Sequence, residues 1–123
     1  EGEETGTRLT PGPEHTALPG FVYGGLIASL IDCHATATGA AAALGAAGRR
    51  PGEGPSPRFV TASLTVDYLR PTPLGPELEI RGRVRQLGER KAVVEAELRA
   101  EGVVTARGKA VVVRLPAERG ATA

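Results

Sequence analysis

The residues of this chain best suited to chemistry lie in one short segment, Tyr23-Gly-Gly-Leu-Ile-Ala-Ser-Leu-Ile-Asp32-Cys-His34. Paired glycines at the start of a helix leave backbone N–H groups uncovered, so that an oxygen bearing negative charge can approach them. Asp32 follows two turns later among small and apolar neighbours, where a carboxylate can act as a base or as a nucleophile. The two features together indicate acyl-transfer chemistry.

The pattern around Asp32 predicts a helix with two unlike sides. At about 100° per residue, small or polar residues share one stripe of this helix, namely Gly25, Ala28, Ser29, Asp32, Thr36 and Gly39. The opposite side carries Leu26, Ile27, Leu30, His34 and Ala41. A solvated helix face normally bears Lys, Glu or Arg, and this stripe has none of them. We therefore expect the stripe to meet a second surface closely. The alternative is a solvent-facing acid on an amphipathic helix.

The neighbouring His34 and Cys33 have less reactive interpretations. His34 lies about 200° around the helix from Asp32, so the two cannot form a dyad on one helix. We expect a packed histidine hydrogen-bonded to backbone, and a small core residue at Cys33. A single Cys excludes an internal disulfide, and His15, Cys33 and His34 have the wrong number and spacing for a metal site. No metal is predicted.

Size and composition exclude several classes of function. With 123 residues the chain fits one domain, and its net charge is +1 from fifteen basic and fourteen acidic residues. Two Tyr, two Phe and no Trp supply few stacking platforms, so nucleic-acid binding is not expected. No uninterrupted apolar run reaches the length of about 18 residues that indicates a membrane span, and no signal peptide is visible. We expect no membrane partner and a cytoplasmic protein.

The elements that must position these residues follow from changes in periodicity. Residues 1–20 are expected to be a loose lead-in with a short strand around Thr7–Leu9, and the helix is predicted from about Tyr23 to Leu44. A mobile connector is expected over 49–57, because it is rich in Pro and Gly.

From Phe59 onward, apolar and polar residues alternate with period two, which predicts four strands of an antiparallel sheet with one buried face. In the first of these strands the expected buried residues are Val60, Ala62, Leu64, Val66 and Tyr68. Residues 21–115 would form one α+β domain and 116–123 a flexible tail. A single unit would leave the small-residue stripe and a sheet edge uncovered, so a dimer is expected.

Three motifs together resemble the hotdog-fold thioesterases, and within them the PaaI-like acyl-CoA thioesterases. The motifs are Pro19-Gly-Phe-Val-Tyr-Gly-Gly25, Val66-Asp-Tyr-Leu-Arg-Pro-Thr-Pro-Leu-Gly75 and Gly88-Glu-Arg-Lys91. The resemblance covers roughly Pro19 to Leu115. It implies the hotdog fold, in which a curved antiparallel sheet wraps one long central helix.

The resemblance also implies roles for individual residues. Asp32 matches the helical acid that acts as general base or nucleophile. Gly25 matches the glycine whose backbone N–H polarises the thioester carbonyl as an oxyanion hole. Thr61 matches a Ser or Thr that positions water or the acid from across the dimer. Tyr23 stands where most members carry His, and a tyrosine can donate a hydrogen bond but cannot shuttle a proton near neutral pH.

The implied substrate is an acyl-CoA of small or medium acyl length, bound by a homodimer or homotetramer. Coenzyme A is then part of the substrate, and no separate cofactor is expected. Residues expected to contact substrate are Gly24, Ser29 and Thr36 beside Asp32, and Arg70, Arg90 and Lys91 at the phosphates; the alternative for the last three is solvated strand ends. The alternative function is a non-catalytic acyl-CoA or acyl-carrier binding module of the same fold. A dehydratase fits less well, because His34 is on the wrong face of the helix.

Overall fold

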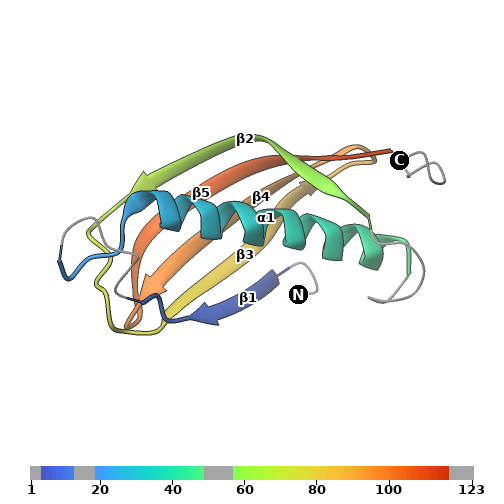
Figure 1. Ribbon diagram of the computed structural model, residues 1–123. Helices are drawn as coiled ribbons and strands as arrows, with labels where there is room; N and C mark the ends of the chain where they lie inside the picture. The colour runs from blue at the N-terminus through green and yellow to red at the C-terminus, as the bar shows by residue number, and fades with distance from the viewer. Residues whose placement is uncertain (1–3, 13–18, 49–56, 117–123) are drawn as a thin grey trace.

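A computed structural model describes residues 4–12, 19–48 and 57–116. One helix and five strands follow in the order β1 (Glu4–Leu9), α1 (Gly24–Ala46), β2 (Phe59–Tyr68), β3 (Leu78–Leu87), β4 (Lys91–Ala100) and β5 (Val103–Arg114). The strands form a single curved sheet, and α1 lies lengthwise across one of its faces (Figure 1). The predicted α+β hotdog architecture, with a central helix wrapped by an antiparallel sheet, is confirmed.

The order of strands in the sheet places the helix between two edges. The order is β1-β3-β4-β5-β2, and every neighbouring pair is antiparallel. The two edge strands are therefore β1 and β2, and Figure 1 shows them on opposite sides of α1. A side chain on one flank of the helix can reach β1, and a side chain on the other flank can reach β2.

The helix begins and ends within two residues of its predicted bounds, but its buried face is rotated from the predicted one. Ile27, Ile31 and Ala35 recur every four residues and lie against the sheet, the last two with no exposed surface. A Cβ on Gly108 would come within 2.5 Å of the Ile31 side chain, so this glycine lets helix and sheet approach closely.

Several residues of the predicted helix faces change sides as a result of this rotation. Gly39, expected in the small-residue stripe on the side away from the sheet, is buried against the sheet, and an ideal Cβ there would lie 3.0 Å from Val112. Ala41, expected on the buried side, is exposed, and Leu26 and Leu30 are only half-buried. The helical wheel misplaced the boundary between the two sides by about one residue. The error arises because small residues occur all around the helix and leave no sharp boundary between its apolar and polar sides.

The expectation that each strand has one buried face is confirmed for β3, β4 and β5. Ile80, Val94 and Val112 point toward α1 and are almost fully buried. In β2 the prediction is correct only for Leu64 and Val66, which pack against the core. Tyr68 was expected to be buried and is 52% exposed. Val60 and Ala62 are exposed instead, because the register with β5 shifts between Thr61 and Ser63.

The short strand expected around Thr7–Leu9 is confirmed, and it begins earlier, at Glu4. It pairs with β3 along its whole length, so this part of the expected loose lead-in belongs to the sheet. The expected mobile connector falls, apart from Pro57, on residues outside the described ranges, as does the expected tail apart from Pro116. By length and composition alone α1 could cross a membrane, but its buried side here forms the core of the domain.

Candidate functional site

The carboxylate of Asp32 is tied to the edge strand β2. Asp32 is half-buried on the flank of α1, and its Oδ1 accepts a short hydrogen bond from the Thr61 hydroxyl. No other partner of this carboxylate is found among the described residues. The sequence predicted that both residues belong to the site. The structure brings them together within one chain, whereas the resemblance implied a contact across a dimer.

The irregularity in β2 is what turns Thr61 toward the helix. Thr61 pairs with Val112 and Ser63 pairs with Val111, so Ala62 is an extra residue in the strand. A β-bulge of this kind reverses which side chains point to which face, and bulges often re-aim a side chain next to a site. Strict alternation from Leu64 would have placed Thr61 on the outer face. The bulge therefore turns the Thr61 hydroxyl toward Asp32.

The N-terminus of α1 is open. Tyr23 is the N-cap residue with extended backbone, its side chain makes no capping hydrogen bond, and the first turn contains no acid. Leu26 and Ile27 both donate their backbone N–H groups to the Tyr23 carbonyl. Among the described residues, these are the first N–H groups of the helix that have a carbonyl partner. The N–H groups of Gly24 and Gly25 stay available to an oxygen that carries negative charge.

The segment after β2 holds this open end in place. The Val22 N–H donates to the Thr72 carbonyl at 2.9 Å, and the Leu74 N–H donates to the Gly20 carbonyl at 2.8 Å. The Thr72 side chain is itself buried and donates to the Thr105 hydroxyl. The motif that runs to Gly75 thus holds the chain just before α1 through backbone hydrogen bonds.

Tyr23 lies directly beside the glycine pair. An ideal Cβ on Gly25 would be 3.0 Å from the Tyr23 ring, so the ring rests against this glycine. The side chain is 39% exposed. The residue that stands where the resemblance expects His therefore borders the open amides with an aromatic face.

Gly25 and Asp32 are not brought together within one chain. They lie on nearly the same side of α1 but seven residues apart, which is about 10 Å along a helix that rises 1.5 Å per residue. Ser29 and Thr36 flank Asp32 on this side, Ser29 exposed and Thr36 half-buried. The Thr36 hydroxyl donates to the Cys33 carbonyl at 3.0 Å.

The three basic residues expected at the coenzyme A phosphates are all exposed, and they lie at two ends of the sheet. Arg70 follows β2 near the N-terminus of α1, and its N–H donates to the Thr105 carbonyl. Arg90 lies in the turn between β3 and β4, where its carbonyl accepts from the Arg114 N–H, and Lys91 is the first residue of β4. One chain does not gather these three cations into one cluster.

His34 lies on the other flank of α1, against β1. It is 8% exposed, its Nε2 is 2.6 Å from the Thr5 hydroxyl, and its Nδ1 is 3.0 Å from the Thr7 hydroxyl. The buried Thr38 hydroxyl lies 2.6 Å from that of Thr5 and donates to the His34 carbonyl. Burial lowers the pKa of His34, and a hydrogen bond to the Thr5 backbone partly opposes this effect. His34 is packed as expected, but both of its ring nitrogens lie at threonine hydroxyls, whereas backbone partners were expected.

The expectation that Cys33 is a core residue is wrong. Its thiol is free and the residue is exposed, because the buried side of α1 passes through Ile31, His34 and Ala35 and Cys33 points away from it. Among the described residues, no three His, Cys, Asp or Glu side chains gather as metal ligands.

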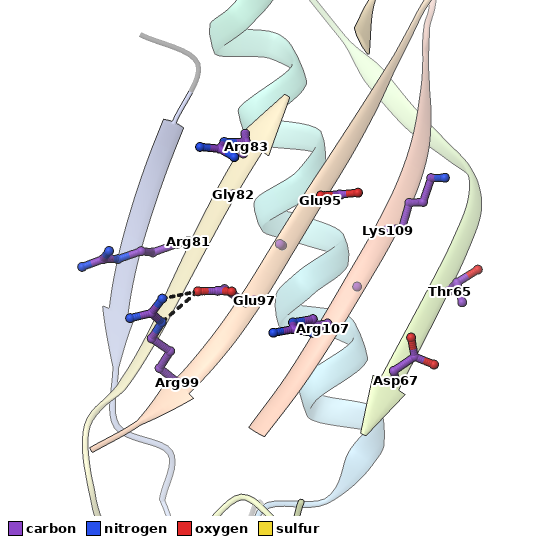
Figure 2. Close-up of a pocket in the computed structure, with 12 residues that line it drawn as sticks. Thr65, Asp67, Arg81, Gly82, Arg83, Glu95, Glu97, Arg99, Arg107 and Lys109 are labelled. Atoms are coloured by element: carbon purple, nitrogen blue, oxygen red, sulfur yellow. Dashed lines mark hydrogen bonds and ion pairs between the residues drawn. The ribbon is translucent and has the colours of Figure 1, made fainter. Parts of the chain in front are cut away.

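The outer face of the sheet carries charge in alternating rows (Figure 2). In one row, Glu97 of β4 lies opposite Arg81 of β3 and Arg107 of β5 in the strand register. In the next row, Glu95 lies opposite Arg83 and Lys109. Opposite charges on directly paired residues stabilise a sheet modestly. The hollow on this face is lined largely by these charged side chains and lies on the side of the sheet away from Asp32.

The fold and the site define the class of protein, and comparison with known sequences agrees. The sequence profile of the Thioesterase superfamily matches residues 19–107, which is most of the chain. The chain therefore belongs to the thioesterase superfamily, with a PaaI-like hotdog fold.

Solved structures resemble the chain over nearly its full length. A thioesterase superfamily protein from Shewanella loihica PV-4 is 51% identical, with a TM-score of 0.77 over 94% of this chain and 87% of that one. The PaaI protein of the E. coli phenylacetic acid degradation operon is 18% identical, with a TM-score of 0.78 over 94% of this chain and 75% of that one. The second likeness concerns the fold alone.

A named enzyme also resembles part of the chain. The acyl-coenzyme A thioesterase THEM4 of Xenopus laevis is 37% identical over 90 residues, which are 73% of this chain and 35% of the relative. The chain thus spans about a third of the length of this relative.

Proposed function

We propose that this chain is an acyl-CoA thioesterase that hydrolyses the thioester of a small or medium acyl-CoA. The observation that carries the proposal is the half-buried Asp32 carboxylate, which Thr61 orients through one oxygen while the other stays free among the described residues. Further support comes from the superfamily match and from THEM4, whose name states this activity. Solved relatives of the same fold are described as bound to acetyl-CoA and to CoA.

Two chemical routes fit this arrangement. In the first, Asp32 takes a proton from water while the water oxygen attacks the thioester carbonyl carbon. In the second, an Asp32 oxygen attacks that carbon directly, and water then hydrolyses the resulting anhydride. In both routes the carbonyl oxygen becomes negative and accepts from the Gly25 N–H. Collapse of this tetrahedral intermediate breaks the carbon–sulfur bond. In the first route the CoA thiolate takes the proton that Asp32 removed from water. In the second route the thiolate leaves as the anhydride forms, before water hydrolyses the anhydride, and it takes a proton from solvent.

The site would be shared between copies of the chain. A single thioester carbonyl cannot contact the Gly25 amide and the Asp32 carboxylate of one chain, because about 10 Å separates them along the helix. The proposal therefore pairs Gly25 of one copy with Asp32 of another, in a homodimer or homotetramer. The exposed edge strand β2, in which Val60 is 45% exposed, supports an interface beside Asp32. A stable monomer in sedimentation experiments would contradict this part.

The remaining expected contacts complete the proposal. Gly24, Ser29 and Thr36 would border the acyl group, and Arg70, Arg90 and Lys91 would meet the CoA phosphates. Because Arg70 lies far from the other two cations along the sheet, they would act at different parts of the substrate or from different copies. The protein would work in the cytoplasm without a separate cofactor.

The test measures release of free thiol from a panel of acyl-CoAs, with wild type beside Asp32→Ala. Hydrolysis by the wild type alone would support the proposal, and the panel would rank the acyl groups. Binding of acyl-CoA without hydrolysis by either protein would favour the alternative, a non-catalytic acyl-CoA binding module. That alternative is favoured by the Tyr23 ring, which lies against Gly25 where the resemblance expects His.

A further inference from the structure

A contact that the sequence did not predict joins the end of β2 to the glycine pair. The Tyr68 hydroxyl donates to the Gly24 carbonyl oxygen at 2.8 Å. The Tyr68 side chain also covers Gly24, since an ideal Cβ on this glycine would lie 3.3 Å from two ring carbons and the hydroxyl oxygen of Tyr68. Gly24 thus allows the ring to approach the backbone, and the hydroxyl then reaches the carbonyl.

This carbonyl belongs to the same peptide unit as the Gly25 N–H. A peptide unit is planar and almost always trans, so its C=O and N–H point in opposite directions. A hydrogen bond that fixes the direction of the Gly24 oxygen therefore also fixes the direction of the Gly25 hydrogen. A donor on the oxygen polarises the whole unit as well, and hydrogen bonds in such a chain strengthen one another.

Tyr68 is itself held by the residues that follow it. The N–H groups of Leu69 and Arg70 both donate to the Thr105 carbonyl, at 2.9 and 3.2 Å. This anchors the backbone on the C-terminal side of Tyr68 to β5, while the ladder with β5 holds Tyr68 opposite Ala106. The hydroxyl thus extends from a part of the sheet whose backbone is hydrogen-bonded to β5, although the side chain is 52% exposed.

We infer that Tyr68 is a positioning residue for thioester hydrolysis: its hydroxyl orients and polarises the Gly24–Gly25 peptide so that the Gly25 N–H stabilises the developing oxyanion. The inference rests on the proposed function. It assigns Tyr68 no contact with substrate. The effect should therefore appear in the transition state and hardly at all in binding of the acyl-CoA.

The experiment compares wild type with Tyr68→Phe, which keeps the ring against Gly24 and removes only the hydroxyl. Complete loss of an oxyanion donor costs 10²–10³ in kcat, and here the donor is weakened rather than removed. We expect kcat to fall about 5- to 10-fold, in line with the net worth of one hydrogen bond, with KM unchanged. The amide NMR signals of Gly25 should shift, because its peptide unit loses polarisation. Thr65→Val is the matched control, since it removes a hydroxyl from the outer face of β2.

The outcomes separate this inference from the proposed function. Equal kcat for wild type and Tyr68→Phe, or an unshifted Gly25 amide, would overturn the positioning role and leave the thioesterase assignment intact. An increase in KM with unchanged kcat would also overturn it, because it would place Tyr68 in substrate binding. If the wild type hydrolyses no acyl-CoA in the panel, the proposed function fails and the catalytic role of Tyr68 fails with it.

Discussion

On each flank of α1, a polar side chain of the helix is hydrogen-bonded to threonine hydroxyls of an edge strand, but the two side chains differ in how completely they are paired. On one flank Asp32 is held by Thr61 of the edge strand β2, and on the other His34 is held by Thr5 and Thr7 of the edge strand β1. His34 is buried and both of its ring nitrogens have hydroxyl partners within the chain. Asp32 is half-buried, and only one of its oxygens has a partner among the described residues. Complete pairing indicates a group that stabilises the fold, and incomplete pairing leaves a group available for reaction.

The largest expected effect on activity follows from replacing the Asp32 carboxylate with an uncharged group. Asp32→Asn keeps the shape of the side chain and an oxygen for Thr61, but it can neither take a proton nor attack a carbonyl. We expect kcat for acyl-CoA hydrolysis to fall about 10²- to 10⁴-fold, the range for loss of a positioned acid or base. The urea unfolding curve should hardly change. Near-wild-type turnover by this variant would show that Asp32 is not a reactive group, and that the two flanks of the helix do not differ in this respect.

The opposite flank should show the opposite pattern. His34→Ala removes a buried ring, and the hydroxyls of Thr5 and Thr7 lose their hydrogen bonds to it. We therefore expect the free energy of unfolding to fall by about 2–3 kcal/mol. Cys33→Ala is the control, because the adjacent Cys33 is exposed and such changes usually stay within about 0.5 kcal/mol. Equal stability of the two variants in urea would show that the His34 network contributes little.

The hydroxyl on the reactive flank can be tested separately. Thr61→Val preserves the shape of the side chain and frees the Asp32 carboxylate to rotate, so kcat should fall about 5- to 10-fold, corresponding to one hydrogen bond. Thr61→Ser keeps the hydroxyl and should restore most of the rate. If Ser and Val at this position behave alike, the hydroxyl does not orient Asp32.

A smaller effect concerns the pH dependence of stability. Burial lowers the pKa of His34 in the folded protein, so as pH falls below about 6.5 the unfolded chain takes up this proton first. Stability should therefore decrease with falling pH from about 6.5 down to the lower folded-state pKa. The reference is His34→Gln, which cannot titrate. Its unfolding free energy should change less over this interval than that of wild type, and parallel curves would contradict the predicted direction.

The sequence alone predicted the fold class, the helix and the strand periods, because these depend on local patterns of apolar residues. The helical pattern singled out Asp32 as a candidate for the site, and the resemblance to the hotdog-fold thioesterases implied roles for Gly25 and Thr61. The short strand at Thr7–Leu9 was predicted too, although its start at Glu4 was not. Local periodicity carries little information about where an edge strand begins.

Only the tertiary structure decided which side chains meet. The bulge at Ala62 reverses the face on which Thr61 lies, and a two-residue period has no signal for an inserted residue. The contacts of Tyr68 with Gly24 and of His34 with β1 join residues more than twenty-five positions apart in the chain. Their partners are fixed by the order of strands around α1, which depends on how the whole sheet closes over the helix.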